Sequence, residues 1–197
     1  MKLVLASKNE KKLKEMNDIL SGLGVEVCLQ SDVGVDVDVE ETGSTFEENS
    51  LLKAKAVMEA SGLPAVADDS GLCVDALNGA PGVWSARYGG EGLDDMGRCR
   101  LLLSSMPRGA ARTAKFVSVI TCCFPNGDVL TARGECPGTI AFAPMGKGGF
   151  GYDPVFFLPG LKKTFAQLSA EEKNAVSHRG KELKAFSEKL EEYLCRT

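Results

Sequence analysis

Two adjacent carboxylates are the residues around which the chemistry of this sequence is organised. Asp68 and Asp69 follow the apolar run 63–66 and precede Ser70 and Gly71. An apolar run of this kind is typical of a buried strand, so we expect the carboxylates at the carboxyl end of that strand. Successive side chains of an extended chain point to opposite faces, which predicts different roles for the two groups. A solvated turn explains the same four letters if they are taken alone.

An anion site is predicted near the beginning of the chain. The apolar stretch 2–6 reads as a strand that leads directly into a helix. This connection places Ser7, Asn9 and the first backbone amides at the positive end of the helix dipole, where anions bind. Lys12, about one turn into the helix, can reach the same anion. An ordinary N-cap with a solvated lysine face is the alternative.

Two further stretches can contribute charged groups to the carboxylates. Residues 32–41 are rich in aspartate and glutamate, and such a loop can complete a site for a hard cation if it meets the carboxylates. Residues 45–60 begin with a capping box and are predicted to form a helix that ends at Gly62. This helix carries Lys53 and Lys55, and one of them can point toward the carboxylates because the helix leads into their strand.

The loop 146–154 has the composition of a pocket for a flat ring. Its glycines allow the backbone to approach a ligand closely, and Phe150 or Tyr152 can stack on a ring. Asp153 can accept hydrogen bonds from ring N–H groups. A glycine turn with aromatic residues that close the core is an equally good explanation of these residues by themselves.

The only histidine, His178, is predicted to lie among polar residues rather than in the core. Together with Arg179 it presents several N–H donors, which suit a phosphate or a carbonyl oxygen on a base. Zinc is not expected, because the chain offers no second histidine and no cysteine at ligand spacing.

The remaining patterns predict a mixed α/β fold. Residues 71–90 form a long glycine-rich connection, which suggests a lid or a partner surface. Alternation over 114–124, an Asn-Gly turn and the run 129–136 predict a β-hairpin, so the sheet should contain antiparallel strands. Apolar residues at helical spacing predict helices over 94–106 and at the C-terminal end of the chain.

Composition restricts the class of protein. The 197 residues, of which 44% are hydrophobic and 25% charged, suffice for one domain with a sizeable core. The net charge of −4 gives no general attraction to nucleic acid or to an anionic membrane, so we expect neither as a partner. No targeting segment and no apolar run of spanning length are seen, which predicts a cytoplasmic protein. The seven cysteines are scattered and are expected to be reduced thiols in the core.

Taken in order, these stretches resemble the inosine triphosphate pyrophosphatase family, whose members remove non-standard purine nucleoside triphosphates from the nucleotide pool. The resemblance covers nearly the whole chain, and its motifs are weak singly but specific in combination. The motifs are Ser7-x-Asn9-x-x-Lys12, Glu40-Glu41-Thr42-Gly43 with Phe46-x-Glu48-Asn49, Ala67-Asp68-Asp69-Ser70-Gly71, Gly79-x-Pro81-Gly82-x-x-Ser85-Ala86-Arg87-Tyr88, Gly148-Gly149-Phe150-Gly151-Tyr152-Asp153-Pro154, and Lys173 with Ser177-His178-Arg179.

The resemblance implies a single domain over residues 1–197, an elongated α/β fold of two lobes around a long mixed β-sheet, with the active-site cleft between the lobes. It implies a homodimer that uses Mg²⁺ to hydrolyse ITP, dITP and XTP to the monophosphate and pyrophosphate. Asp69 would be the proton acceptor, and Glu40 and Asp69 would hold the magnesium ion. The substrate-binding residues that the resemblance implies are Ser7, Lys8, Asn9, Glu10, Lys11, Lys12, Lys53, Ser70, Phe150, Gly151, Tyr152, Asp153, Lys173, His178 and Arg179.

Base selection has a plausible physical basis in these residues. A 6-oxo purine offers an acceptor where adenine offers an amino donor, so donors from His178 or Arg179 would be left unpaired by adenine. Three other interpretations fit parts of the sequence. A pyrophosphatase of the Maf-like septum-associated family leaves the 150–153 and 177–179 motifs unexplained. A non-catalytic nucleotide sensor does not need the intact carboxylate pair, and a purely structural module does not need the glycine-rich loops.

Overall fold

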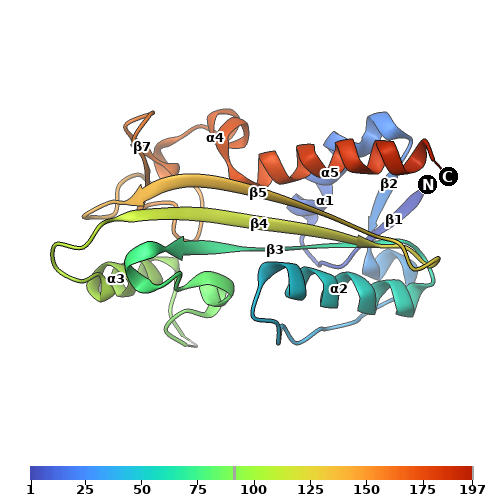
Figure 1. Cartoon of the computed structure of the whole chain (residues 1–197), viewed down its shortest axis with the longest axis horizontal. Helices are drawn as coiled ribbons and strands as arrows, with labels where there is room; N and C mark the ends of the chain where they lie inside the picture. The colour runs from blue at the N-terminus through green and yellow to red at the C-terminus, as the bar shows by residue number, and fades with distance from the viewer. Residues whose placement is uncertain (91, 197) are drawn as a thin grey trace. The chain divides into compact units, whose positions relative to one another are not determined.

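The computed structural model describes residues 1–90 and 92–196 and is a mixed α/β structure (Figure 1). Its seven-stranded sheet has the order β2-β1-β3-β4-β5-β6-β7. The strands are β1 (Lys2–Leu5), β2 (Glu26–Leu29), β3 (Ala65–Val74), β4 (Thr113–Cys123), β5 (Val129–Ile140), β6 (Phe156–Leu158) and β7 (Lys163–Thr164). The α-helices in this part of the chain are α1 (Glu10–Leu20), α2 (Phe46–Ser61), α3 (Asp95–Ser105), α4 (Ala170–Val176) and α5 (His178–Leu194). The predicted fold class is confirmed.

The sheet is mixed, as the hairpin signal predicted. β1 pairs in parallel with β2 and with β3, whereas β6 pairs antiparallel with β5 and with β7. The chain folds into two compact units. Unit 1 comprises Met1–Asp69, Ser118–Gly134 and Lys181–Thr197, and unit 2 comprises Ser70–Val117 and Glu135–Gly180. β3, β4 and β5 contribute residues to both units.

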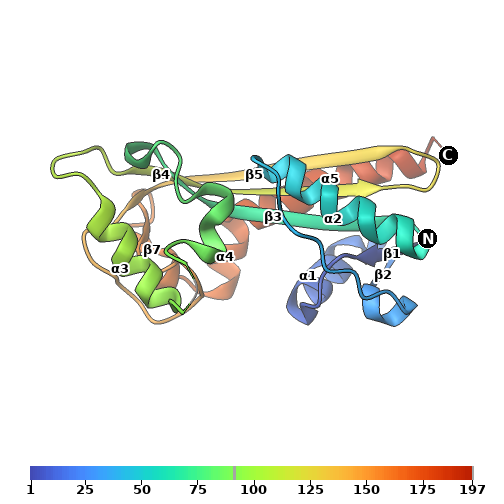
Figure 2. The same ribbon diagram turned by 90° about the horizontal axis from the view of Figure 1, so that it is seen from below.

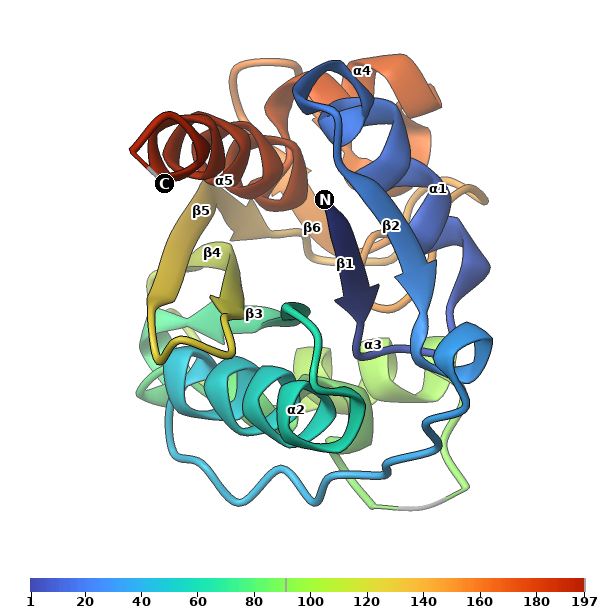
Figure 3. The same cartoon turned by 90° about the vertical axis from the view of Figure 1, so that its right-hand side faces the viewer.

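In unit 1, two apolar layers cover opposite faces of the strands. Leu5 and Val66 belong to a buried cluster that includes side chains of α1 and α5. Val4 and Ala67 instead belong to clusters that include side chains of α2. Figures 1 and 3 show α2 and α5 on opposite sides of the sheet, and Figure 2 shows α1 beside β1 and β2. Side chains that alternate along β3 therefore meet different helices.

Unit 2 has an aromatic core. Phe116 and Phe156 pack edge to face with ring centroids 4.6 Å apart, and Phe116 stacks on Phe165 at 5.6 Å. The imidazole of His178 stacks on Phe116 with centroids 4.8 Å apart. The expectation that His178 lies among polar residues is therefore wrong. His178 is the first residue of α5, and its ring packs against the aromatic residues of unit 2.

The helix boundaries follow local capping chemistry, and the predicted ones are confirmed. The Thr45 hydroxyl accepts a hydrogen bond from the amide of Glu48, and Glu48 accepts one in return from the amide of Thr45. Gly62 ends α2 in the left-handed conformation with φ of 66°. Ser169 and Glu172 form the same reciprocal arrangement at the start of α4.

Two strands extend beyond their predicted ends. β3 continues to Val74, so the paired carboxylates lie inside a ten-residue strand and not at its carboxyl end. Ser70 and Gly71 do not break this strand, because the fully buried Leu72 and Val74 extend the apolar core beyond them. β5 likewise continues to Ile140. Within residues 1–90 and 92–196, no helix has the length and apolar character to cross a membrane.

Candidate active site

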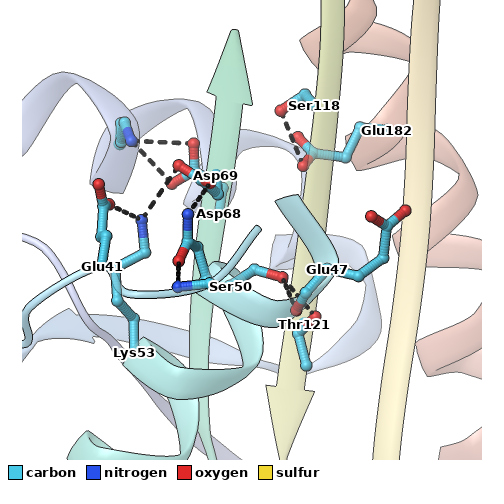
Figure 4. Close-up of polar contacts among 12 residues, drawn as sticks. Glu41, Glu47, Ser50, Lys53, Asp68, Asp69, Ser118, Thr121 and Glu182 are labelled. Carbon is cyan, nitrogen blue, oxygen red and sulfur yellow. Dashed lines mark hydrogen bonds and ion pairs between the residues drawn. The ribbon is translucent and has the colours of Figure 1, made fainter. Parts of the chain in front are cut away.

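The two carboxylates of β3 contact different helices of unit 1 (Figure 4). Both Asp68 oxygens accept hydrogen bonds from the Lys12 ammonium of α1, at 2.8 and 2.9 Å. Asp69 Oδ2 accepts one from the side-chain amide of Asn49 at 3.2 Å, and its Oδ1 lies 3.5 Å from Lys53 Nζ. Asn49 and Lys53 belong to α2, which covers the other face of the strand. The two side chains thus have different partners, as expected for successive residues of a strand, and their different roles stay a prediction.

Lys53 is shared by two carboxylates. Its Nζ lies 2.7 Å from Glu41 Oε1 and 3.5 Å from Asp69 Oδ1. Lys55, the other lysine considered for this role, is exposed and pairs with Glu59 at 3.8 Å. Lys53 is therefore the lysine of α2 that reaches the paired carboxylates.

The position of α2 is fixed by buried polar contacts. Ser50 and Thr121 share a hydrogen bond of 2.8 Å between buried hydroxyl groups, which ties α2 to β4 (Figure 4). Asn49 is completely buried, and its Oδ1 accepts a hydrogen bond of 2.8 Å from the amide of Gly43. This contact orients the Asn49 amide so that its nitrogen donates to Asp69.

Burial raises the pKa of Asp69, and the neighbouring Glu41 charge acts in the same direction. The Lys53 ammonium and the Asn49 amide oppose this effect but do not cancel it. Burial by itself would lower the pKa of Lys53, yet the carboxylates of Asp69 and Glu41 outweigh burial and raise it. The arrangement is a charged ammonium beside a carboxylate with increased proton affinity, which suits Asp69 to accept a proton.

The start of α1 is an N-cap, as one of the two interpretations proposed. Asn9 Oδ1 accepts hydrogen bonds from the amides of Lys11 and Lys12, at 3.0 and 3.3 Å. Ser7 Oγ accepts one of 3.1 Å from the amide of Asn9. These first amides are thus already bonded within the chain, and the Lys12 ammonium is the cationic group of this stretch that contacts a carboxylate of β3.

The other charged residues of this stretch lie at the surface. Glu10 and Lys11 are exposed, and Lys8 Nζ pairs with the exposed Asp36 at 2.8 Å. Surface pairs of this kind contribute little to stability. The structure therefore does not bring Lys8, Glu10 and Lys11 to the carboxylates of β3.

Sequence reasoning missed two residues beside Asp69. Glu41 contacts Lys53, whereas Glu40, which was expected to hold magnesium, is exposed. Asn49 could have been found, because it lies four residues before Lys53 and therefore on the same face of a helix. No local signal separates Glu40 from Glu41 in a loop.

Asp69 and Glu41 are the described groups that best fit a hard cation. Within the described ranges, no cluster of three or more His, Cys, Asp and Glu side chains is arranged to hold a metal. Magnesium commonly takes one or two carboxylates and completes its coordination with water and substrate phosphates. Asp69 and Glu41 both contact the Lys53 ammonium, so their carboxylate oxygens lie near each other. These two carboxylates suit a magnesium ion that is also bound by a substrate phosphate.

Residues expected to form the ring pocket contact one another in unit 2. Asp153 Oδ2 accepts hydrogen bonds from the Phe150 amide at 2.9 Å and from Lys173 Nζ at 2.5 Å. Lys173 Nζ also lies 4.6 Å from the centre of the Phe150 ring. Burial raises the pKa of Asp153, an effect that the Lys173 charge opposes. The buried Asp153 thus links the loop 146–154 to Lys173.

The structure decides which aromatic residue of the loop is available for stacking. Phe150 is 69% exposed, whereas Tyr152 is 4% exposed and its hydroxyl donates to the backbone oxygen of Ser85 at 2.9 Å. Ser85 is itself buried, and its hydroxyl accepts from the amide of Leu72 at 2.9 Å. The connection after β3, expected as a lid or partner surface, therefore anchors Tyr152.

The remaining expected substrate residues also belong to unit 2. Ser70 is half-buried in β3, and His178 and Arg179 are half-buried in the first turn of α5. Gly151 has φ of +58°, a left-handed conformation that glycine adopts readily. The expected residues are thus grouped as a carboxylate and lysine set in unit 1 and an aromatic set in unit 2.

Known proteins are similar to this chain in sequence and in fold. The model of the Ham1 family matches residues 3–189. The chain is 49% identical over 193 residues to a dITP/XTP pyrophosphatase of Desulforamulus reducens, with 96% of each chain covered. It is 50% identical to a dITP/XTP pyrophosphatase of Haemophilus influenzae, with 96% of this chain and 98% of the relative covered. The Staphylococcus aureus Ham1 protein superposes with a TM-score of 0.93 at 42% identity, with 98% of this chain and 100% of that chain covered. The resemblance inferred from the motifs is confirmed, and the chain belongs to the Ham1 family.

Proposed function

We propose that this protein hydrolyses non-standard purine nucleoside triphosphates, namely ITP, dITP and XTP, to the monophosphate and pyrophosphate. Its Ham1 relatives carry the name dITP/XTP pyrophosphatase and match it over nearly their full length. The observation that carries the proposal is the state of Asp69, a buried carboxylate with a raised pKa that contacts Lys53 and the oriented Asn49 amide. A protein that only binds nucleotides has no need for such a base.

In the proposed reaction Asp69 orients a water molecule and accepts its proton. The water oxygen bonds to the α-phosphorus, and the bond between the α-phosphorus and the bridging oxygen breaks, so that pyrophosphate leaves with that bond's electron pair. Magnesium, held by Asp69 with Glu40 or Glu41, would neutralise phosphate charge and lower the pKa of bound water. The Lys53 ammonium favours the charged form of Asp69 and so opposes the rise in its pKa that burial causes.

The triphosphate is proposed to bind Lys12 and Lys53, together with Ser7, Asn9 and Ser70. An ammonium group carries three N–H donors, so Lys12 can keep its contact with Asp68 and still donate to a phosphate oxygen. Lys53 is likewise positioned by Glu41 and Asp69 before any substrate arrives. Such preorganised charges stabilise the negative charge that develops on the leaving oxygens.

The base is proposed to stack on the exposed ring of Phe150. Lys173, held beside this ring by Asp153, belongs to the same pocket. Donors from His178 or Arg179 would pair with the 6-oxo group of hypoxanthine or xanthine. Adenine would place its amino group against these donors and leave them unpaired, which weakens its binding.

The proposal also includes a homodimer, as the family resemblance implies, and a cytoplasmic location, as the sequence predicts. Sedimentation equilibrium of the purified protein tests the oligomeric state, and cell fractionation tests the location.

The test of the proposed function is pyrophosphate release from ITP, dITP, ATP and GTP by the purified protein with Mg²⁺. A strong preference for ITP and dITP that disappears with chelator and with Asp69→Asn supports the proposal. Lys55→Met is a control variant that should retain pyrophosphate release, because it removes only an exposed ion pair with Glu59 on α2. Equal pyrophosphate release from all four substrates would contradict the proposed selection of the base. Tight binding without release would favour a nucleotide sensor.

A further inference from the structure

The Phe150 ring is largely exposed, yet the next residue, Gly151, is held at both its backbone nitrogen and its backbone oxygen. The amide of Gly151 donates to Asp95 Oδ2 at 2.7 Å. The carbonyl oxygen of Gly151 accepts from Cys99 Sγ at 3.3 Å. Asp95 and Cys99 are four residues apart in α3 and therefore lie on one face of that helix. One helix face thus fixes a single residue of the loop.

This residue needs external restraint more than its neighbours do. Gly151 has a φ of +58°, and glycine has the widest conformational freedom of any residue. On its two sides, the Phe150 amide is bonded to Asp153 and the Tyr152 hydroxyl to Ser85. Without the contacts from α3, Gly151 would be the least restrained link between these two anchored positions.

Cys99 is suited to act as a donor. It is completely buried, and burial raises the pKa of its thiol to about 11, with further contributions from nearby aspartate charges. The group therefore remains protonated at neutral pH and can donate to a carbonyl oxygen. Asp95 supplies a carboxylate oxygen as the acceptor, and hydrogen bonds to carboxylates are about twice as strong as those between neutral groups.

We propose that Asp95 and Cys99 are positioning residues that hold Gly151 so that the Phe150 ring is presented in one orientation to the purine of the substrate. The proposal rests on the proposed function, because it assumes that Phe150 stacks on the base. Loosening Gly151 leaves the lysines and carboxylates of unit 1 unchanged. Variants of Asp95 and Cys99 should therefore weaken binding of the base and leave the rate of the chemical step unchanged.

The variants are Asp95→Ala and Cys99→Ala, with Asp95→Asn as the conservative exchange that keeps an acceptor oxygen. Asp94→Ala is the matched control, because Asp94 caps α3 through the amide of Gly97 at 2.7 Å and is not bonded to Gly151. Comparison with Asp94→Ala distinguishes the effect of releasing Gly151 from the effect of destabilising the start of α3.

Steady-state kinetics with ITP should show KM raised about tenfold in Asp95→Ala, the usual effect of losing one hydrogen bond to a charged group, with kcat nearly unchanged. Cys99→Ala should show a smaller rise of the same kind. The inhibition constant of IMP should rise in parallel with KM, whereas that of inorganic pyrophosphate, which has no base, should not change. Asp95→Asn, which keeps a neutral acceptor, should recover about half of the lost binding free energy and leave KM about threefold above that of the wild type.

Amide hydrogen exchange at Gly151 supplies a readout that does not depend on activity. Exchange should accelerate in Asp95→Ala and remain slow in Asp94→Ala. Unchanged exchange, an equal KM effect in Asp94→Ala, or a parallel loss of pyrophosphate binding would each overturn the proposal. If the wild-type protein releases no pyrophosphate, the proposed function fails. The positioning role is then decided by ITP binding measured calorimetrically in the same variants, where an unchanged Kd would reject it.

Discussion

Replacement of Lys53 by methionine should destabilise the protein, and the structure sets the size of the effect. Lys53 Nζ lies 3.5 Å from Asp69 Oδ1, and at an effective dielectric constant of about 20 such a pair attracts by about 5 kcal/mol. The Lys53 side chain is 18% exposed and that of Glu41 is 24% exposed, so solvent screening and ammonium desolvation offset much of this attraction. We expect a net loss of about 2 kcal/mol in the free energy of unfolding.

For a chain of this length, that loss corresponds to a fall of about 4–8 °C in Tm, measured by differential scanning calorimetry at pH 7. The effect should depend on pH. The raised pKa of Asp69 should rise further once the Lys53 charge is removed. At low pH the carboxyl is neutral with or without Lys53. The difference between wild type and variant should therefore shrink as pH falls through the Asp69 titration.

Two variants make this reasoning refutable. Lys55→Met, which removes an exposed pair, should change the stability by no more than about 0.5 kcal/mol. Lys53→Met combined with Asp69→Asn should be more stable than Lys53→Met alone, because no buried charge is left beside a missing partner. A Lys53→Met protein as stable as Lys55→Met at pH 7, or a loss that persists unchanged at acid pH, would show that the ammonium does not stabilise the Asp69 carboxylate.

Three further outcomes are expected. Asp69→Asn should reduce pyrophosphate release by at least about 10³-fold, and near wild-type turnover would remove Asp69 from the mechanism. Circular dichroism and Tm should show an intact fold that is equally or more stable, because a neutral amide avoids the cost of burying a charge that raises the pKa of the carboxyl group. Arg179→Ala should lower the ratio of kcat/KM for ITP to that for ATP, and an unchanged ratio would contradict a role in base selection. Gly149→Ala should raise KM for ITP and lower Tm, because φ is +74° and a Cβ there would collide with Asp153; kinetics and stability like those of wild type would show that Asp153 can move without consequence.

Local chemistry in the sequence determined much of the fold. Capping boxes at 45–48 and 169–172 determined where α2 and α4 begin, because both partners of each bond lie within one helical turn. The period of a strand placed Asp68 and Asp69 on opposite faces. The motifs, taken in order, also identified the family, since each is a short local pattern that the chain preserves.

Contacts between distant residues were decided only by the tertiary structure. The sequence did not indicate that Lys12 meets Asp68, that Glu41 meets Lys53, or that β3 continues beyond Gly71. It also placed His178 among polar groups, although the ring of this α5 residue stacks on Phe116 of β4. The physical reason is common to all of these cases. A side chain's direction follows from its own element, but the partner it meets depends on how separate elements pack, which no local spacing encodes.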